Sequence, residues 1–180
     1  MKATGIVRRV DSLGRVVIPK EIRHTLRIRE GSPLEIYTDK EGGVTFRKYS
    51  PLGELQEFSQ QICRSIHRNT GFIAAISDPD SIIAVAGAPR RELQNRPNSA
   101  DLEELMTQRK TYRFQPDQGH IPPTDASDKY YLGVAAPILS QGDLSGCVML
   151  LLQEDAPVPA DAHQTLIQTI ADFLGDQLEE

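Results

Sequence analysis

The sequence is poor in cysteine and in aromatic residues, and it contains no tryptophan. Its two cysteines, Cys63 and Cys147, lie far apart and form no Cys-x-x-Cys motif, so a disulfide scaffold is not expected. No run of about 18 apolar residues occurs, which argues against a transmembrane helix. Residues 1–9 lack the apolar stretch of a secretory signal. These absences together predict a soluble cytoplasmic protein.

The sequence motifs of common enzymes and cofactor sites are also missing. There is no G-x-G-x-x-G, P-loop, G-x-S-x-G or H-E-x-x-H sequence. Cys63 and His67 are four residues apart on a predicted helix, but no third or fourth ligand follows at a matching interval. His120 and His163 stand alone. We therefore predict no metal, no cofactor and no catalytic activity.

Charge divides the chain into two contrasting parts. Residues 1–50 carry eleven Lys and Arg against six Asp and Glu, whereas residues 51–180 carry nine against nineteen. A basic segment on an acidic remainder predicts that the first part binds a polyanion and that the second does not. Breaker residues around Pro51 mark the boundary, and we expect domains at residues 1–52 and 53–180.

The basic part, called the head below (residues 1–52 as predicted), has the pattern of a small strand-rich unit. The predicted strands are Gly5–Val10, Arg15–Ile18, Leu34–Thr38 and Val44–Lys48. Pro19 suits the first position of a short helix, and Gly31 marks its expected end. A unit this small buries too little surface to fold alone without disulfides, metal or a partner. Since it has no cysteine, we predict an obligate dimer through the head.

Two stretches of the head carry a specific resemblance. They are TGIVRRVD at residues 4–11 and LGRVVIPKEIR at residues 13–23, followed by LRIREG and LEI. This sequence closely resembles the AbrB-like family of bacterial transition-state regulators. The resemblance implies a looped-hinge, swapped-hairpin β-barrel in which two chains interlace their strands, with arginines on one surface binding double-stranded DNA.

The family motif also suggests which side chains contact DNA. The arginines at its positions fall on Arg8, Arg15 and Arg23, with Lys2 and Arg9 as further phosphate contacts. Arginine suits this role because its planar guanidinium group matches phosphate oxygens or a guanine edge. Salt bridges to acidic neighbours such as Asp11 are the structural alternative for these side chains.

One position departs from the family pattern. His24 stands where relatives often have a second arginine, so its DNA contact is weaker or depends on pH.

The remainder, called the body below (residues 53–180 as predicted), alternates helices and strands. The predicted order is helix 54–68 ending at Gly71, strands 72–77 and 82–87, helix 99–109 capped by Ser99, loop 114–128, strands 131–139 and 147–152, and helix 160–177. This order predicts an α+β domain with an antiparallel sheet and flanking helices. It resembles a GAF domain, which implies a small-molecule effector pocket between the sheet and the loops. Loop 114–128 is equally compatible with a lid and with disorder.

Apolar stripes on the first and last helices of the body have two interpretations. The GAF resemblance implies that they pack against a second subunit as a bundle; an ordinary intrachain core explains them equally well. The residues concerned are Leu55, Phe58, Ile62, Ile66, Leu166, Ile170, Phe173 and Leu174. If the heads and the bodies pair separately, a homotetramer results.

The family resemblance and the charge contrast together predict a DNA-binding transcription regulator, repressor or activator, of spore-formation genes. The alternative is an antitoxin of a toxin–antitoxin pair, because such proteins use the same small barrel. A short acidic tail is typical of antitoxins, whereas about 130 residues of alternating elements follow this head. An enzyme built on the body is disfavoured by the missing motifs.

Overall fold

A computed structural model describes residues 5–179, and Lys2 therefore lies outside the described residues. The chain divides into two compact units between Tyr49 and Ser50. This division lies slightly before the predicted boundary and places Pro51 and Leu52 with the body. Leu52 is fully buried in the core of the body, which explains the placement.

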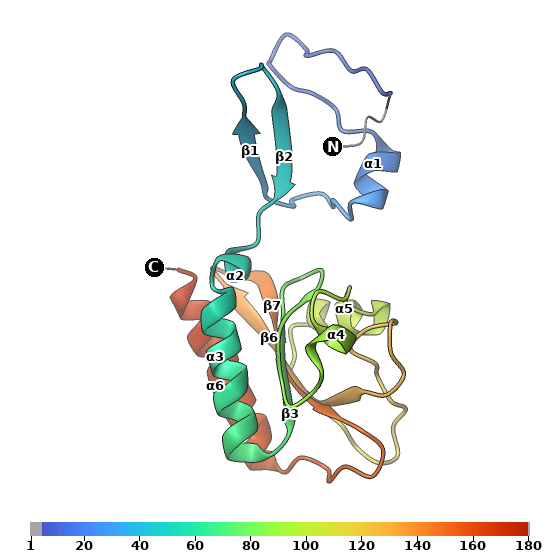
Figure 1. Cartoon of the computed structure of the whole chain (residues 1–180), viewed down its shortest axis with the longest axis vertical. Coiled ribbons are helices and arrows are strands. Elements are labelled where there is room, and N and C mark those ends of the chain that lie inside the picture. Colours follow the sequence, from blue (N-terminus) through green and yellow to red (C-terminus); the bar gives the residue numbers. More distant parts are fainter. Residues whose placement is uncertain (1–4, 180) are drawn as a thin grey trace. The chain divides into compact units, whose positions relative to one another are not determined.

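The head contains one short helix and one β-hairpin (Figure 1). Its elements are α1 (Lys20–Thr25), β1 (Leu34–Thr38) and β2 (Val44–Lys48). The predictions of β1 and β2 are confirmed, and the strands pair antiparallel from Leu34 with Lys48 to Thr38 with Val44. Asp39 holds the intervening turn, because its Oδ1 accepts hydrogen bonds from the backbone N–H groups of Glu41 and Gly43.

Two predicted strands of the head are absent from the single chain. Residues 5–10 and 15–18 have no strand pairing, and only the turn between them, Asp11–Gly14, forms. Within the described residues of one chain no neighbouring strand offers these segments its backbone groups. The helix is also shorter than predicted, because α1 ends at Thr25 and not near Gly31. Arg27 has a positive φ of 53°, which a helix does not allow.

The body is built on one antiparallel sheet. Its elements are α2 (Pro51–Glu54), α3 (Gln56–Thr70), β3 (Ile73–Ser77), β4 (Ile82–Ala86), α4 (Arg90–Leu93), α5 (Ala100–Thr107), β5 (Tyr112–Arg113), β6 (Tyr131–Ser140), β7 (Asp143–Leu152) and α6 (Asp161–Gln177). The strand order is β4-β3-β7-β6-β5. The predicted α+β architecture is confirmed.

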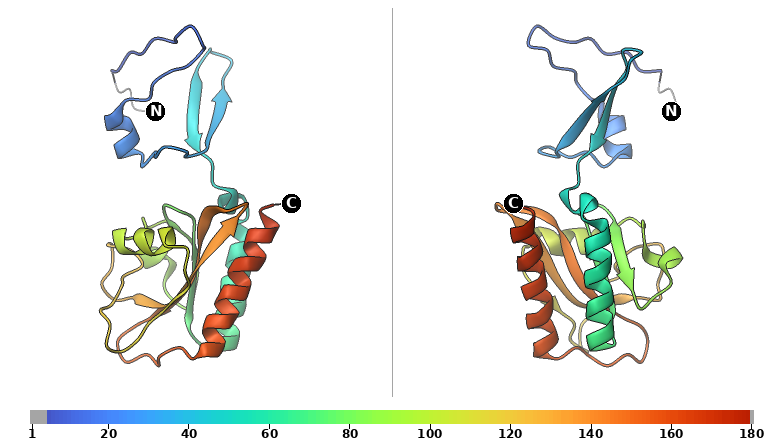
Figure 2. Two further views of the ribbon diagram at one scale, coloured as in Figure 1. Left: turned by 180° about the vertical axis from the view of Figure 1, so that it is seen from behind. Right: turned by 60° about the vertical axis from the view of Figure 1, so that its left-hand side comes forward.

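Helices cover the two faces of this sheet differently (Figures 1 and 2). α3 and α6 lie side by side on one face, over a core that includes Ile66, Ile76, Leu150 and Leu174. α4, α5 and the loop 114–128 cover the other face. That loop is irregular, as predicted, and it is anchored: Phe114 is 5% exposed, and the Leu132 N–H donates to the Ile121 carbonyl over 2.8 Å.

The first helical segment of the body consists of two helices, α2 and α3, where a single helix was predicted. Ser50 caps α2, because its Oγ accepts a hydrogen bond from the Gly53 N–H, and Leu55 then separates α2 from α3. α3 ends where expected, at Gly71 in the left-handed conformation with a φ of 77°. The short elements α4 and β5 were not predicted, because a single turn or a residue pair leaves no periodic signal.

Candidate nucleic-acid interface

The described cationic residues of the predicted DNA-binding surface are all exposed. Arg8 and Arg9 lie in the irregular segment before the Asp11–Gly14 turn, and Arg15 directly follows that turn. Arg23 and His24 lie in the last turn of α1. The exposure leaves these groups available to a ligand, while the single chain does not by itself bring the three arginines onto one continuous surface.

Arg15 is held by the turn that precedes it. The Asp11 carboxylate accepts hydrogen bonds from the backbone N–H groups of Leu13 and Arg15, and Arg15 Nε lies 2.8 Å from Asp11 Oδ2. The Arg15 backbone N–H and then its side chain lower the pKa of Asp11. The acidic-neighbour alternative is therefore realised for Arg15. This contact engages its Nε, and the side chain remains 71% exposed.

The head leaves most of its apolar side chains in contact with solvent. Among residues 5–49 only Pro19 is buried, and Val7 is 86% exposed. The exposed large apolar residues of the head are Ile6, Val7, Val10, Leu13, Val16, Val17, Leu26, Ile36, Tyr37, Val44, Phe46 and Tyr49. A surface this apolar on so small a unit is typical of an interface.

Two of these exposed side chains show a signal that the sequence reasoning missed. Ile36 and Phe46 are directly opposite each other in the β1–β2 register, so they share one face of the hairpin. Both remain exposed, at 61% and 43%. The alternation of apolar residues along both strands identifies this face from sequence alone.

The two helix stripes of the body separate into core and surface residues. Ile66 and Leu174 are buried in the intrachain core, 3% and 0% exposed, which corrects their assignment to an intersubunit contact. Leu55, Phe58, Ile62 and Ile170 are partly buried, and Leu166 and Phe173 are exposed. The rings of Phe58 and Phe173 lie 6.3 Å apart, so α3 and α6 of one chain present a joint apolar strip.

The layer between the sheet and its loop-covered face is filled by the chain itself. Side chains of Leu93, Leu102, Met106, Leu132 and Met149 pack there and are almost fully buried. Core side chains fill most of this layer, and at its edge Leu105, Tyr112 and Ile121 line an open pocket.

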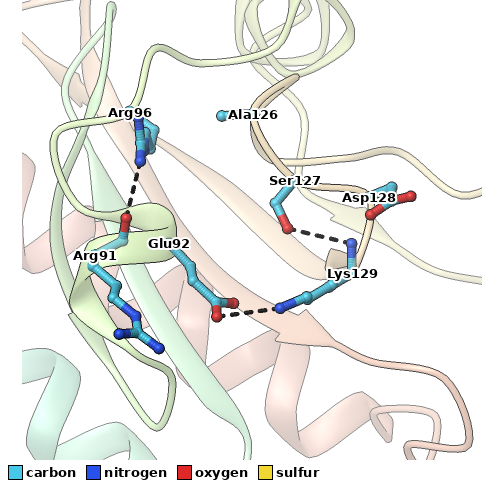
Figure 3. A pocket seen from close by; sticks show the side chains of 7 residues that line it. All are labelled: Arg91, Glu92, Arg96, Ala126, Ser127, Asp128 and Lys129. Atoms are coloured by element: carbon cyan, nitrogen blue, oxygen red, sulfur yellow. Dashed lines mark hydrogen bonds and ion pairs between the residues drawn. The ribbon is translucent and has the colours of Figure 1, made fainter.

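Outside that layer lies an open surface pocket. Arg91, Glu92 and Arg96 line it together with the loop residues 126–129, and the Glu92 side chain points toward Lys129 (Figure 3). Lys129 Nζ donates to Glu92 Oε1 over 3.2 Å, and the hydroxyl of the neighbouring Tyr130 donates to Glu92 Oε2 over 2.7 Å.

The described residues contain no cluster of three or more potential metal ligands. Burial raises the pKa of the Cys63 thiol to about 12 and also raises that of Cys147, so both thiols stay protonated within the core. No helix within residues 5–179 has the length and apolarity needed to cross a bilayer.

Comparisons with known proteins agree with this two-part architecture. The family model of the stage V sporulation protein T C-terminal domain, described as a transcription factor, matches residues 54–179, and that of the MazE antitoxin matches residues 7–53. Stage V sporulation protein T of Bacillus subtilis (strain 168) is 40% identical over 184 residues, covering 100% of both chains. The transition state regulatory protein AbrB of the same organism is 61% identical over 51 residues, 28% of this chain and 52% of that protein.

A solved structure identifies the fold of the body. The GAF domain/HD domain protein from Geobacter sulfurreducens superposes with a TM-score of 0.52 at 15% identity, over 69% of this chain and 91% of that chain. The body therefore has the GAF fold, and the head is AbrB-like in sequence. Because the C-terminal family model covers most of the chain and the Bacillus subtilis relative aligns over the whole of both proteins, the chain belongs to the stage V sporulation protein T family of transcription factors.

Proposed function

We propose that this chain regulates the transcription of spore-formation genes, as repressor or activator, by binding promoter DNA through its head. The observation that carries the proposal is the 40% identity to stage V sporulation protein T over the full length of both chains. A regulator of chromosomal genes acts where the bacterial chromosome lies, in the cytoplasm. The exposed arginines of the head supply the positive charge that such binding requires.

The head acts as a dimer in this proposal. Its exposed apolar side chains lie open to solvent, and its segments 5–10 and 15–18 have no strand pairing within the described part of one chain. A second head that exchanges a hairpin supplies strands for these backbone groups and covers the apolar residues, which gives the interlaced barrel that the AbrB-like sequence implies. Two heads then present two copies of Arg8, Arg15 and Arg23 to one duplex.

DNA recognition in this arrangement depends mainly on phosphates. α1 spans only Lys20–Thr25, which is too short to fill a major groove, so few side chains reach base edges. Sequence-dependent shape and flexibility of the DNA then supply much of the selectivity. Lys2 and Arg9 add phosphate contacts, and His24 makes a weaker one than arginine would.

The bodies extend the assembly. The apolar strip on α3 and α6, formed by Leu55, Phe58, Ile62, Leu166, Ile170 and Phe173, packs against the same strip of another subunit. If this pairing joins different dimers, a homotetramer results. A small-molecule effector, as the GAF resemblance implies, would bind in the open pocket that Leu105, Tyr112 and Ile121 line at the edge of the packed layer.

The antitoxin function has one observation in its favour, the match of the MazE model to residues 7–53. Antitoxins of this kind use a flexible acidic segment to bind the toxin. Here the residues that follow the head form a packed α+β domain with two apolar cores. That domain favours a regulator over an antitoxin.

The decisive test removes the three family arginines together. Arg8→Ala, Arg15→Ala and Arg23→Ala in one chain should reduce the slope of log affinity against log salt by about 2.7 per chain and weaken promoter binding by about 10²–10³-fold. The matched control, Lys40→Ala with Arg109→Ala and Lys110→Ala, removes the same charge from exposed positions elsewhere. Anisotropy titrations on a footprinted promoter fragment measure both. If the two variants lose the same promoter affinity, DNA binding does not depend on Arg8, Arg15 and Arg23 in particular.

A further inference from the structure

The positive charge of the body is concentrated around one short helix. Residues 51–180 contain only nine Lys and Arg. Five of them line two surface hollows on either side of α4: Arg91, Arg96 and Lys129 in one, Arg64 and Arg90 in the other. Arg90 and Arg91 are consecutive on α4 and join the two hollows, and all five side chains are exposed. We call these five residues the α4 patch.

The acidic groups next to the patch do not neutralise it. The Glu92 carboxylate accepts a hydrogen bond from Lys129 Nζ over 3.2 Å (Figure 3). It also accepts one from the Tyr130 hydroxyl over 2.7 Å. Hydrogen bonding from Tyr130 and then from Lys129 lowers the pKa of Glu92, so its carboxyl group is ionised at neutral pH. Asp128 is the other carboxylate that lines these hollows. Most of the positive charge of the patch is therefore uncompensated.

The four arginines of the patch contact backbone oxygens or solvent. Arg96 donates to the Arg91 carbonyl over 3.1 Å, and Arg64 donates to the Gln60 carbonyl over 3.3 Å. Within residues 5–179 none of the four guanidinium groups forms a salt bridge with a carboxylate, and only Arg91 has a carboxylate, that of Glu92, close enough for its charge to act on it. Guanidinium groups that form no salt bridge are available to an anionic ligand, and their clustering gives this part of an acidic domain a local positive field.

We infer that the α4 patch is a second DNA-binding surface, which contacts backbone phosphates outside the segment bound by the heads. Guanidinium groups match phosphate oxygens in a bidentate geometry, and four of the five cations are arginine. The inference rests on the proposed function, because a regulator already bound to a promoter brings its body to a long polyanion. It also revises the prediction that the acidic body avoids nucleic acid.

The test compares two lengths of the same DNA with the full chain. The short duplex is the promoter segment that the chain protects in footprinting, and the long duplex extends it by about two helical turns (~20 bp) on each side. Arg90→Gln with Arg91→Gln should leave short-duplex affinity within twofold, weaken long-duplex binding about tenfold and lower its salt slope by about 1.8 per chain. Arg109→Gln with Lys110→Gln, an adjacent exposed pair with the same charge change, should alter neither.

The possible outcomes separate the two proposals. If the unaltered chain binds neither duplex, the proposed function itself fails. If it binds both duplexes with equal affinity and salt slope, only the second DNA surface is refuted. Equal losses in the two glutamine variants, or a change of oligomeric state in Arg90→Gln with Arg91→Gln by sedimentation, would also refute it, since the patch would then act through general charge or through another copy of the chain.

Discussion

The head and the body differ in how much of their apolar side-chain surface is buried within one chain. The body buries most of its large apolar residues on both faces of one sheet, and among its described residues Leu139, Val158, Leu166 and Phe173 are the large apolar ones that stay well exposed. The head, with far fewer residues, exposes twelve, and its first segments have no strand partner within the described chain. The body is therefore packed as a folded unit in one chain, whereas the head would bury its apolar residues in the proposed dimer with a second copy.

The largest loss of stability is expected where two backbone segments of the body lie closest to each other. A Cβ built at Gly175 on α6 would overlap the carbonyl oxygen of Leu139 on β6, and a rigid carbonyl cannot move aside as a flexible side chain does. Gly175→Ala should therefore lower the free energy of unfolding by about 3 kcal/mol. Urea denaturation followed by circular dichroism measures the change.

Gly119→Ala is the matched control for this substitution. No heavy atom outside the immediate neighbours lies within 4 Å of a Cβ built at Gly119, so stability should change by less than about 0.5 kcal/mol. If the two variants are equally stable, α6 does not pack on β6 as closely as described here.

The head should instead lose stability when apolar residues that are exposed in one chain are replaced by charged ones. Val17 is 71% exposed there, yet in the proposed dimer it lies in an interface strand. Val17→Asp would bury an unpaired carboxylate between chains and should cost about 2 kcal/mol per head. Faster hydrogen exchange of the β1 and β2 amides, with loss of promoter binding, is the expected result.

The same substitution in the body provides the comparison. Val158 is also exposed, at 46%, and lies in the segment before α6. Val158→Asp should leave exchange of the head amides and promoter affinity unchanged. If Val17→Asp is as harmless as Val158→Asp, the exposed apolar residues of the head are not a dimer interface.

This contrast also explains how far the sequence predicts the structure. β1, β2, the β3–β4 hairpin and the C-terminal helix were recognised, because their apolar periodicity and turn residues act within a few positions of one another. Residues 5–10 have an equally clear β pattern but no strand partner in one chain. Local sequence indicates that a segment favours extended backbone. It does not indicate whether the neighbouring strand comes from the same chain or from another.

The candidate sites show a similar limit. Arg8, Arg15 and Arg23 were identified through a family motif, and their exposure agrees with a binding role without testing it. Ile66 and Leu174 were assigned to an intersubunit contact but lie in the core. Periodicity shows that a helix has an apolar face; it does not show which part of that face is covered within the chain. The α4 patch was missed because Arg64 and Lys129 come close to Arg90, Arg91 and Arg96 only in three dimensions.

The smallest expected effect concerns His24, the one position where the head departs from its family pattern. His24 is exposed on the last turn of α1, next to Arg23, so an arginine there fits without repacking. His24→Arg should add one phosphate contact per chain and make the salt slope steeper by about 0.9, with a gain in promoter affinity of up to about tenfold at low salt.

Gln118→Arg adds the same charge on the loop 114–128 of the body and should steepen the slope by much less. If both variants gain equally, net charge alone drives binding, and the electrostatic contrast between head and body has no geometric meaning. A gain confined to His24→Arg would show that the C-terminal turn of α1 faces the DNA, which no property of the isolated head determines.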